Sequence, residues 1–228
     1  MIAQIFYISF GVLSNEYKRS SPEPATKLKI TSTDSSEKYM IVTADHRASK
    51  AAKKILNFGG NAIDAAIAAQ NVLSVVEPQS SGLGGGGFLL FYDNVKKQII
   101  AYDGRETAPS SANPEIFLDS NGDKLPFLGA VSHPKSVGVP GLYNMLADAH
   151  KNHGKIEWKK LFHDAIDYSN GFEVSFRLNK LISWAPHIKK NKFVLDTYYK
   201  QNLPKKPGSI VQNLELKKSL QILSTHPY

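Results

Sequence analysis

Apolar residues recur along the chain with two periods, which separate predicted helices from predicted strands. Helical spacing over residues 48–58, closed by Gly59-Gly60, predicts a helix that Asp45 or Ser49 can cap. Asn61 is predicted to cap a second helix directly after it. Later helices are predicted over residues 142–153, 157–170, 175–185 and 213–223.

The second helix is predicted to be amphipathic. Its apolar residues are spaced for one buried face: Ile63, Ala66, Ile67, Leu73 and Val76. Its many alanines allow close packing against a sheet. Asp64, in the first turn, is interpreted as a surface residue that the helix dipole favours, rather than as a catalytic acid.

Strand-like runs occur at residues 40–44, 88–92 and 99–102, and the last two flank a hairpin turn at 94–97. The run at 88–92 is apolar at every position, so both faces of that strand are expected to be covered. A helix on one face and a second sheet on the other would give an αββα sandwich. The pattern also permits a parallel α/β sheet, and periodicity does not decide between the two.

Four consecutive glycines, Gly84 to Gly87, join the second helix to the first hairpin strand. Such a run loses much backbone entropy on folding, so a positive φ or a close approach of another group is expected there. Gly82, Gly84 and Gly87 fit a dinucleotide pattern, but a helix precedes them and a strand follows, which is the wrong order. A tight turn and a backbone-lined substrate site both remain open, and alanine at Gly85 or Gly86 is predicted to be damaging.

Three motifs occur in order along the chain. They are "GGNAIDAAIAAQNVLSVVEPQSSGLGGGGFLLFY" at 59–92, "DGRETAP" at 103–109 and "GVPG" at 138–141. Together they resemble the large-subunit portion of the γ-glutamyltranspeptidases, the glutathione hydrolases of the N-terminal-nucleophile class. The resemblance covers residues 39 to 228 and implies a mixed α/β fold, namely part of a truncated αββα sandwich.

The resemblance also implies where the chemistry lies. A threonine that opens the small subunit is the family's nucleophile, with its own α-amino group as the general base. This chain is expected to stop before that residue, and Thr225, which follows the last predicted helix, is not expected to replace it. The chain alone is therefore expected to be inactive, and the Thr-bearing small-subunit half is its expected partner.

Substrate recognition is what the resemblance leaves to this chain. Arg105 matches the arginine that clamps the α-carboxylate of the γ-glutamyl group of glutathione or another γ-glutamyl compound. Asp103 and Glu106 are expected to orient Arg105, and Gly84, Gly85, Gly86 and Gly87 to support the site. No cofactor is implied. The alternative is a non-catalytic remnant, or a binding module that keeps the γ-glutamyl pocket.

The N-terminal residues 1–38 are interpreted as a leader and tether, and the folded domain is expected to span residues 39–228. Residues 2–13 are apolar enough for the core of a signal peptide, although no basic segment precedes them. The resemblance implies a periplasmic or extracellular protein. No apolar run reaches the eighteen residues that a membrane span requires.

The net charge of +8 comes from the C-terminal part of the chain. Residues 1–150 hold 14 basic and 14 acidic side chains, whereas residues 151–228 hold 14 and 6. The lysines are scattered and no base-stacking or groove-reading motif accompanies them, so nucleic-acid binding is not expected. Residues 119–123 lack the full ligand series of a calcium loop, and the seven histidines show no metal-ligand spacing, so no metal is predicted.

Overall fold

The computed structural model describes residues 35–226, and one compact unit extends from Ile41 onward, separate from the unit before it. Every helix and strand of the described residues belongs to the larger unit. Most of the leader predicted over residues 1–38, including the apolar stretch at 2–13, lies outside the described residues. No helix among the described residues is long and apolar enough to cross a membrane.

Helices α2 (His46–Asn57) and α3 (Ala62–Val76) pack against each other and begin at the predicted caps. The Asp45 carboxylate accepts a hydrogen bond from the backbone N–H of Arg47, 2.9 Å away. Asn61 and Asp64 form a reciprocal capping box at the start of α3. Gly59, with φ +89°, makes the turn between the two helices, where a left-handed backbone favours glycine.

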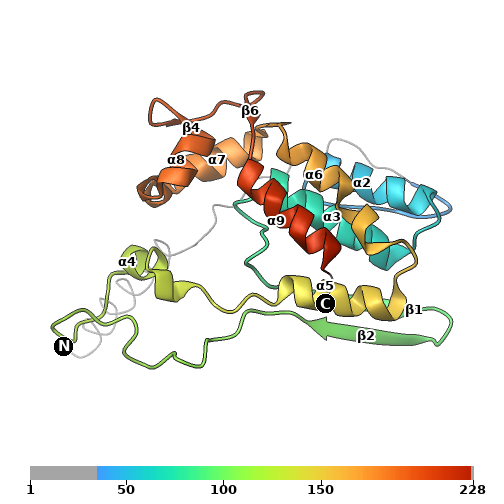
Figure 1. Ribbon diagram of the computed structural model, residues 1–228, viewed down its shortest axis with the longest axis horizontal. Helices are drawn as coiled ribbons and strands as arrows, with labels where there is room; N and C mark the ends of the chain where they lie inside the picture. Colours follow the sequence, from blue (N-terminus) through green and yellow to red (C-terminus); the bar gives the residue numbers. More distant parts are fainter. Residues whose placement is uncertain (1–34, 227–228) are drawn as a thin grey trace, which may run out of the picture. The chain divides into compact units, whose positions relative to one another are not determined.

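Helix α3 is the centre of the hydrophobic core (Figure 1). Around it pack α2, α5 (Leu142–His153), the 3₁₀ helix η2 (Trp158–Phe162) and α6 (His163–Ser169). Eleven of its fifteen residues are buried, so the predicted single buried face is wrong. Ala66, assigned to that face, is exposed. The reason is that helices of this chain cover α3 on several sides.

Asp64 is also buried, and its interpretation as a surface residue is wrong. Its side chain is fully inaccessible, and its two carboxylate oxygens each lie 3.1 Å from the backbone N of Lys155. One of these oxygens accepts from the N–H of Asn61 as well. The Asp64 carboxylate thus caps the start of α3 and holds the segment that follows α5. Because backbone N–H groups satisfy its oxygens, the acid can be buried in the core.

The predicted hairpin is present as strands β1 (Phe88–Asp93) and β2 (Gln98–Asp103), which pair antiparallel from Phe88 opposite Asp103 to Asp93 opposite Gln98. Helix α5 lies along one face (Figure 1), where the ring of Phe91 lies 4.7 Å from that of His153. On the other face Leu90 is 77% and Ile99 73% exposed. The prediction that both faces are covered is wrong for the described residues, because they provide one covering layer only.

The C-terminal part contains short elements around the remaining helices. They are β3 (Phe172–Glu173), α7 (Phe176–Trp184), η3 (Pro186–Lys190), α8 (Lys192–Tyr198), β4 (Tyr199–Lys200), β5 (Leu203–Pro204), β6 (Ile210–Val211) and α9 (Leu214–Thr225). Strand β3 pairs with β6, and β4 pairs with β5. Side chains of Ser175 and Asn213 cap α7 and α9, as expected of these residue types.

Two predicted elements differ from the structure. Residues 40–44 do not form a strand, because no neighbouring strand pairs with them in the described part of the chain. The helix predicted over 157–170 is divided into η2 and α6 at Phe162, whose fully buried ring anchors the change of helix type in the core.

Between β2 and α5 the chain makes a long excursion, residues 107–139, that contains α4 (Phe127–Val131) and η1 (Pro134–Ser136) (Figure 1). Its ends are joined by a β-bridge in which Thr107 and Val139 exchange backbone hydrogen bonds of 2.8 and 3.3 Å. No residue from 108 to 138 is buried. The excursion is therefore held at its base rather than by a core of its own.

Candidate functional site

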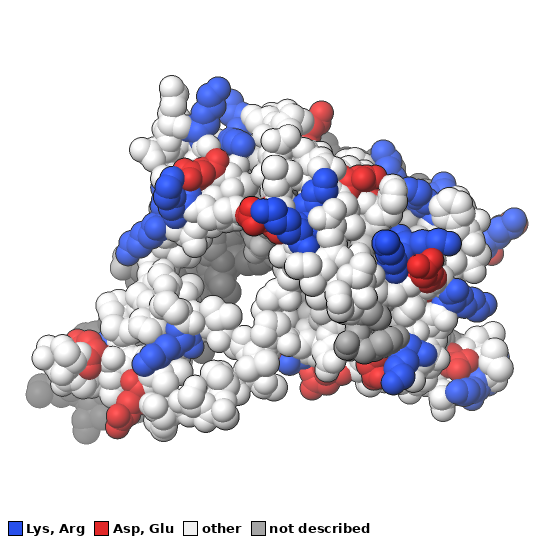
Figure 2. Space-filling view, in the orientation of Figure 1, with Lys and Arg blue, Asp and Glu red and all other residues white. Residues whose placement is uncertain are grey.

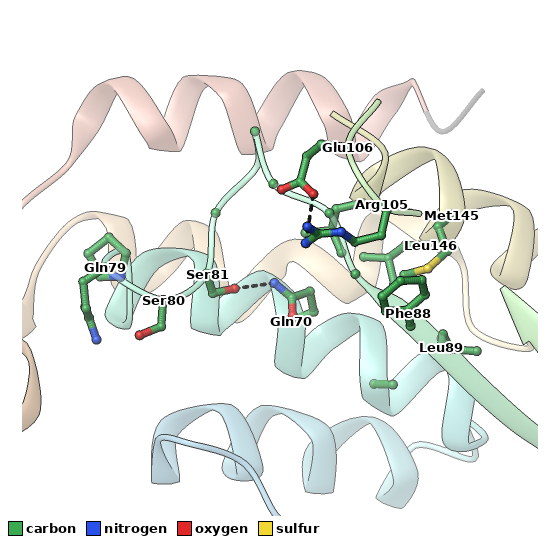
Figure 3. Close-up of a pocket in the computed structure, with 18 of the residues that line it drawn as sticks. Gln70, Gln79, Ser80, Ser81, Phe88, Leu89, Arg105, Glu106, Met145 and Leu146 are labelled. Carbon is green, nitrogen blue, oxygen red and sulfur yellow. Dashed lines mark hydrogen bonds and ion pairs between the residues drawn. The ribbon is translucent and has the colours of Figure 1, made fainter. Parts of the chain in front are cut away.

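A pocket of about 800 Å³ opens where the side of α3, the connection that follows α3, the start of β1 and helix α5 meet (Figure 3). Four groups of residues line it: Ala66 and Gln70 of α3, residues 78–82 and 84–87 of the connection, residues 88–90 with Arg105 and Glu106, and Leu142, Met145 and Leu146 of α5. The wall thus combines apolar side chains with backbone, hydroxyl, amide and charged groups, as is usual of small-molecule sites.

The glycine run is fixed by backbone hydrogen bonds. Gly87 and Gly104 exchange hydrogen bonds of 2.9 and 3.1 Å, and the N–H of Leu142 donates to the carbonyl of Gly85 over 3.2 Å. None of Gly84 to Gly87 has a positive φ. These hydrogen bonds therefore tie the glycine run to the segment after β2 and to the start of α5.

Close approach is confirmed at one glycine of the run. A Cβ on Gly86 would lie 2.5 Å from the carbonyl oxygen of Gly104 and 2.8 Å from the backbone N of Glu106. A Cβ on Gly85 would meet nothing closer than 3.4 Å, and one on Gly84 would meet nothing within 4 Å. Within the described residues, only Gly86 of the pair Gly85 and Gly86 is sterically required, so the prediction for Gly85 lacks a structural reason here.

Arg105 and Glu106 lie together at the rim of the pocket, with their side chains directed toward each other (Figure 3). Arg105 Nη1 lies 3.3 Å from Glu106 Oε2, and the arginine side chain is 62% exposed. The Asp103 carboxylate accepts from the backbone N–H of Arg105 over 2.9 Å. Asp103 therefore holds the turn and Glu106 lies against the guanidinium, while most of the Arg105 side chain, which lines the pocket, is exposed.

The sequence reasoning missed a second polar wall of the pocket, formed by Gln79, Ser80 and Ser81, and the buried carboxylate that supports it. Glu77, the residue after α3, is 1% exposed, and its Oε2 accepts from Gln79 Nε2 (2.6 Å) and from Arg177 Nε (2.9 Å). Burial raises the pKa of the Glu77 carboxyl, and the hydrogen bond and charge of Arg177 oppose this rise. A signal was present in the sequence, since Arg177 is the single arginine after residue 150 among thirteen lysines.

Two other sequence features lie away from the pocket. Thr225 ends α9, where its hydroxyl donates to the carbonyl of Ile222 over 2.9 Å, and it does not line the pocket. His163, Asp164 and Asp167 group their ligand atoms within 4.8 Å, although no metal spacing was recognised. Lys54 already pairs with Asp164 over 2.6 Å, so this surface cluster is explained by ion pairing.

On the face shown in Figure 2, the lysine and arginine side chains of the described residues do not form one patch. In Figure 2 they occur in several separate groups over the face shown, with acidic side chains between them. Several lysines have local acidic partners, such as Lys192 with Asp196 and Lys218 with Glu215. This distribution fits a solvated basic surface.

Comparison with known proteins identifies the family. A family model described as gamma-glutamyltranspeptidase matches residues 48–228. The chain belongs to the γ-glutamyltranspeptidase family. The glutathione hydrolase proenzyme of Bacillus subtilis strain 168 is 36% identical over 185 residues, which cover 81% of this chain and 32% of that protein. Glutathione hydrolase 3 of Arabidopsis thaliana is 36% identical over 191 residues, which cover 83% of this chain and 29% of the relative.

Solved structures agree with this membership. The γ-glutamyltranspeptidase of Helicobacter pylori has a TM-score of 0.79 at 29% identity, and the match covers 85% of this chain and 56% of the solved one. That of Pseudomonas nitroreducens, complexed with L-DON, has a TM-score of 0.75 at 30% identity. The predicted mixed α/β class, part of the N-terminal-nucleophile hydrolase fold, is thus confirmed. The chain spans about a third of the length of these curated relatives.

Proposed function

We propose that this chain forms the substrate-binding part of a γ-glutamyltransferase and glutathione hydrolase, with Arg105 binding the α-carboxylate of the γ-glutamyl group. The observation that carries the proposal is the accessible guanidinium of Arg105 at the rim of the pocket, in a chain of this family. A planar guanidinium pairs with a carboxylate through two parallel hydrogen bonds, which lysine cannot reproduce. Asp103 and Glu106 then serve as supports for Arg105, and the glycine run as the floor beside it.

The reaction proposed for the whole enzyme is attack on the γ-glutamyl amide of glutathione. An acyl-threonine forms as the amine leaves, and water or an amino acid then accepts the γ-glutamyl group. The hydroxyls lining the pocket here are not activated: Ser80 Oγ lies 3.3 Å from Arg177 Nη2, and Ser81 Oγ accepts from Gln70 Nε2. Both partners are hydrogen-bond donors that cannot take up the hydroxyl proton, so we infer that the nucleophile comes from a Thr-bearing small-subunit half.

The same proposal assigns residues 39–228 to a large-subunit domain and residues 1–38 to a leader and tether that place the enzyme in a periplasm or outside the cell. The bare face of the β1–β2 hairpin is then the face on which the small-subunit half completes the αββα sandwich. A γ-glutamyl-binding module without catalysis is the alternative, and the family comparisons do not favour it.

The test is turnover of a γ-glutamyl anilide by this chain assembled with a separately expressed Thr-bearing half. Arg105→Lys is expected to raise KM through the loss of about 2–4 kcal/mol of substrate binding, with the melting temperature unchanged. Arg47→Lys is the matched control, because Arg47 belongs to a different ion pair and does not line the pocket. Both variants are compared by steady-state kinetics and thermal melting.

Three outcomes would contradict the proposal. Product release by the 228-residue chain alone would place a nucleophile within it. An unchanged KM in Arg105→Lys would remove the arginine assignment. Binding of glutathione by the assembled protein with no turnover of any γ-glutamyl compound would favour the binding module.

A further inference from the structure

The wall of the pocket that contains residues 78–81 is tied to a helix 100 positions further along the chain. Arg177, in the first turn of α7, donates from Nε to Glu77 Oε2 (2.9 Å), and its Nη2 lies 3.3 Å from Ser80 Oγ. Its side chain is 33% exposed, whereas that of Glu77 is 2% exposed. One guanidinium thus joins the buried end of α3 to a hydroxyl that lines the pocket.

Glu77 holds the same segment through its backbone and its side chain. The N–H groups of Ser80 and Ser81 both donate to the Glu77 carbonyl, over 3.0 and 2.9 Å. The carboxylate accepts from Gln79 Nε2 over 2.6 Å. Two of the three residues after Pro78 are thus hydrogen-bonded to the backbone of Glu77 and the third to its side chain, so the orientation of this polar wall depends on the position of Glu77.

The position of Glu77 in turn depends on Arg177. A carboxylate at 1–2% exposure is costly unless a cation and hydrogen bonds satisfy it. No other basic side chain among the described residues forms an ion pair with Glu77. Loss of Arg177 would leave an unpaired buried charge, and the simplest relief is rotation of the Glu77 side chain toward solvent, which would displace Gln79 and Ser80.

We propose that Glu77 and Arg177 are positioning residues, whose ion pair holds the Gln79–Ser81 wall of the pocket in place to bind the polar groups of a γ-glutamyl compound. The proposal rests on the proposed function of the pocket. Figure 3 shows Gln79 and Ser80 at the end of the pocket away from Arg105 and Glu106. Arg105 and the Gln79–Ser81 wall would therefore contact different parts of one substrate.

The experiment compares Arg177→Met, Arg177→Lys and the double variant Glu77→Gln/Arg177→Met in the assembled enzyme. Arg177→Met is expected to raise KM by roughly tenfold, the effect of losing about one substrate hydrogen bond, with little change in kcat. Arg177→Lys keeps the positive charge, but one ammonium group cannot reach both Glu77 and Ser80. Its KM should therefore lie between those of the wild type and Arg177→Met. Removal of both charges should restore the melting temperature and lower KM toward the wild-type value, because a neutral side chain at position 77 no longer has to leave its buried site.

A matched control is available in Arg47, which forms a buried ion pair with Asp45 over 2.7 Å and does not line the pocket. Arg47→Met should lower the melting temperature and raise KM less than Arg177→Met does, because the charge of Arg47 acts on Glu77 but its side chain donates to Asp45 and to the carbonyl of Glu173 instead of to the pocket wall. A second readout needs no activity: amide hydrogen exchange over residues 79–82 of the chain should be faster in Arg177→Met than in Arg47→Met.

Two results would overturn the positioning role. One is an Arg177→Met variant that loses stability while its KM stays within about twofold of the wild-type value, which would mean that Arg177 acts on folding alone. The other is unchanged exchange over residues 79–82 in Arg177→Met. An inactive wild-type assembly, or an Arg105→Lys variant with normal KM, would instead count against the proposed function, while the exchange measurement still decides the role of Arg177.

Discussion

Helix α3 and the β1–β2 hairpin follow each other in the chain and are both rich in apolar residues, yet their surroundings differ. On α3, Ile67, Val72 and Val75 are completely inaccessible to solvent. On the hairpin, Leu90 and Ile99 are 77% and 73% exposed. The glycine run between them lines the pocket. The pocket therefore lies at the border between a part that this chain covers and a part that it leaves bare.

This difference in burial shows that an apolar pattern identifies residues that tend to be buried. It does not identify the segment or partner that packs against them. Among the described residues, α2, α5, η2 and α6 all pack closely on α3, whereas α5 packs on the hairpin. An exposed apolar strand face of this kind usually marks an interaction surface. It is consistent with the proposal that a small-subunit half completes the sandwich there.

The largest effect is expected from a matched pair of isoleucines. Ile67→Ala should cost about 2–5 kcal/mol of unfolding free energy, because it opens a cavity at a fully buried position. Ile99→Ala should cost less than about 1 kcal/mol in the 228-residue chain, where its side chain is mostly in water. Urea unfolding of the two variants measures the difference.

The same pair sharpens the comparison after assembly. With the Thr-bearing half bound, the cost of Ile99→Ala should rise toward that of Ile67→Ala, because the hairpin face becomes buried. Equal costs in the chain alone would show that the hairpin is already covered, and an unchanged small cost after assembly would place the partner elsewhere.

A smaller effect is expected within the glycine run. Gly86→Ala should destabilise the chain by about 3 kcal/mol, because its Cβ meets backbone atoms at 2.5 and 2.8 Å that cannot move independently. Gly84→Ala is the control: it has open space and should be neutral or stabilise by about 0.5 kcal/mol through the unfolded state. Melting curves in which both variants behave alike would contradict the steric role of Gly86.

The smallest effect concerns acid sensitivity, through Asp45 at the start of α2, which packs on α3, and Asp93 of the hairpin. At Asp45, burial acts to raise the pKa, but hydrogen bonds from the Arg47 side chain and backbone outweigh it and hold the pKa below 3.8. At Asp93, the last residue of β1, hydrogen bonds from the backbone N–H groups of Lys96 and Val95 lower the pKa. A lowered carboxyl pKa stabilises the fold above 3.8, and that contribution is lost as the pH falls through the lower folded value.

Replacement by asparagine should therefore flatten the loss of stability below pH 3.8. The change should be larger for Asp45→Asn than for Asp93→Asn, because the Asp45 bonds are buried and those of Asp93 are exposed. Stability measured against pH for both variants checks this order, and the reverse order would mean that the hairpin turn resists acid through its own hydrogen bonds.

Features that depend on neighbours in sequence were predicted well. The cap at Asn61 and the hairpin between β1 and β2 are correct because local hydrogen bonding decides them. Features that depend on distant contacts were not: the burial of Asp64 requires the backbone of Lys155, and the pairing of Glu77 requires Arg177. Spacing within one segment carries no information on these partners.

In the candidate site, too, the local motif was recognised from the sequence, whereas contacts between distant segments were not. The motif around Arg105 gave the residue and its proposed ligand, and the structure adds which glycine is sterically required. The roles of Arg105, Asp103 and Glu106 stay predictions, which rest on the resemblance and on the exposed side chain of Arg105.

The excursion between β2 and α5 is joined at its base by the bridge between Thr107 and Val139, and none of its residues from 108 to 138 is buried. A protease that cuts near α4 would therefore sever the chain without removing any core contact. Gly104 and Gly141, on either side of the bridge, would still be in contact through the Gly104 carbonyl, 2.5 Å from where a Cβ on Gly141 would lie. The site at Arg105 should thus tolerate a nicked chain, and limited proteolysis offers a way to shorten the protein without disturbing its pocket.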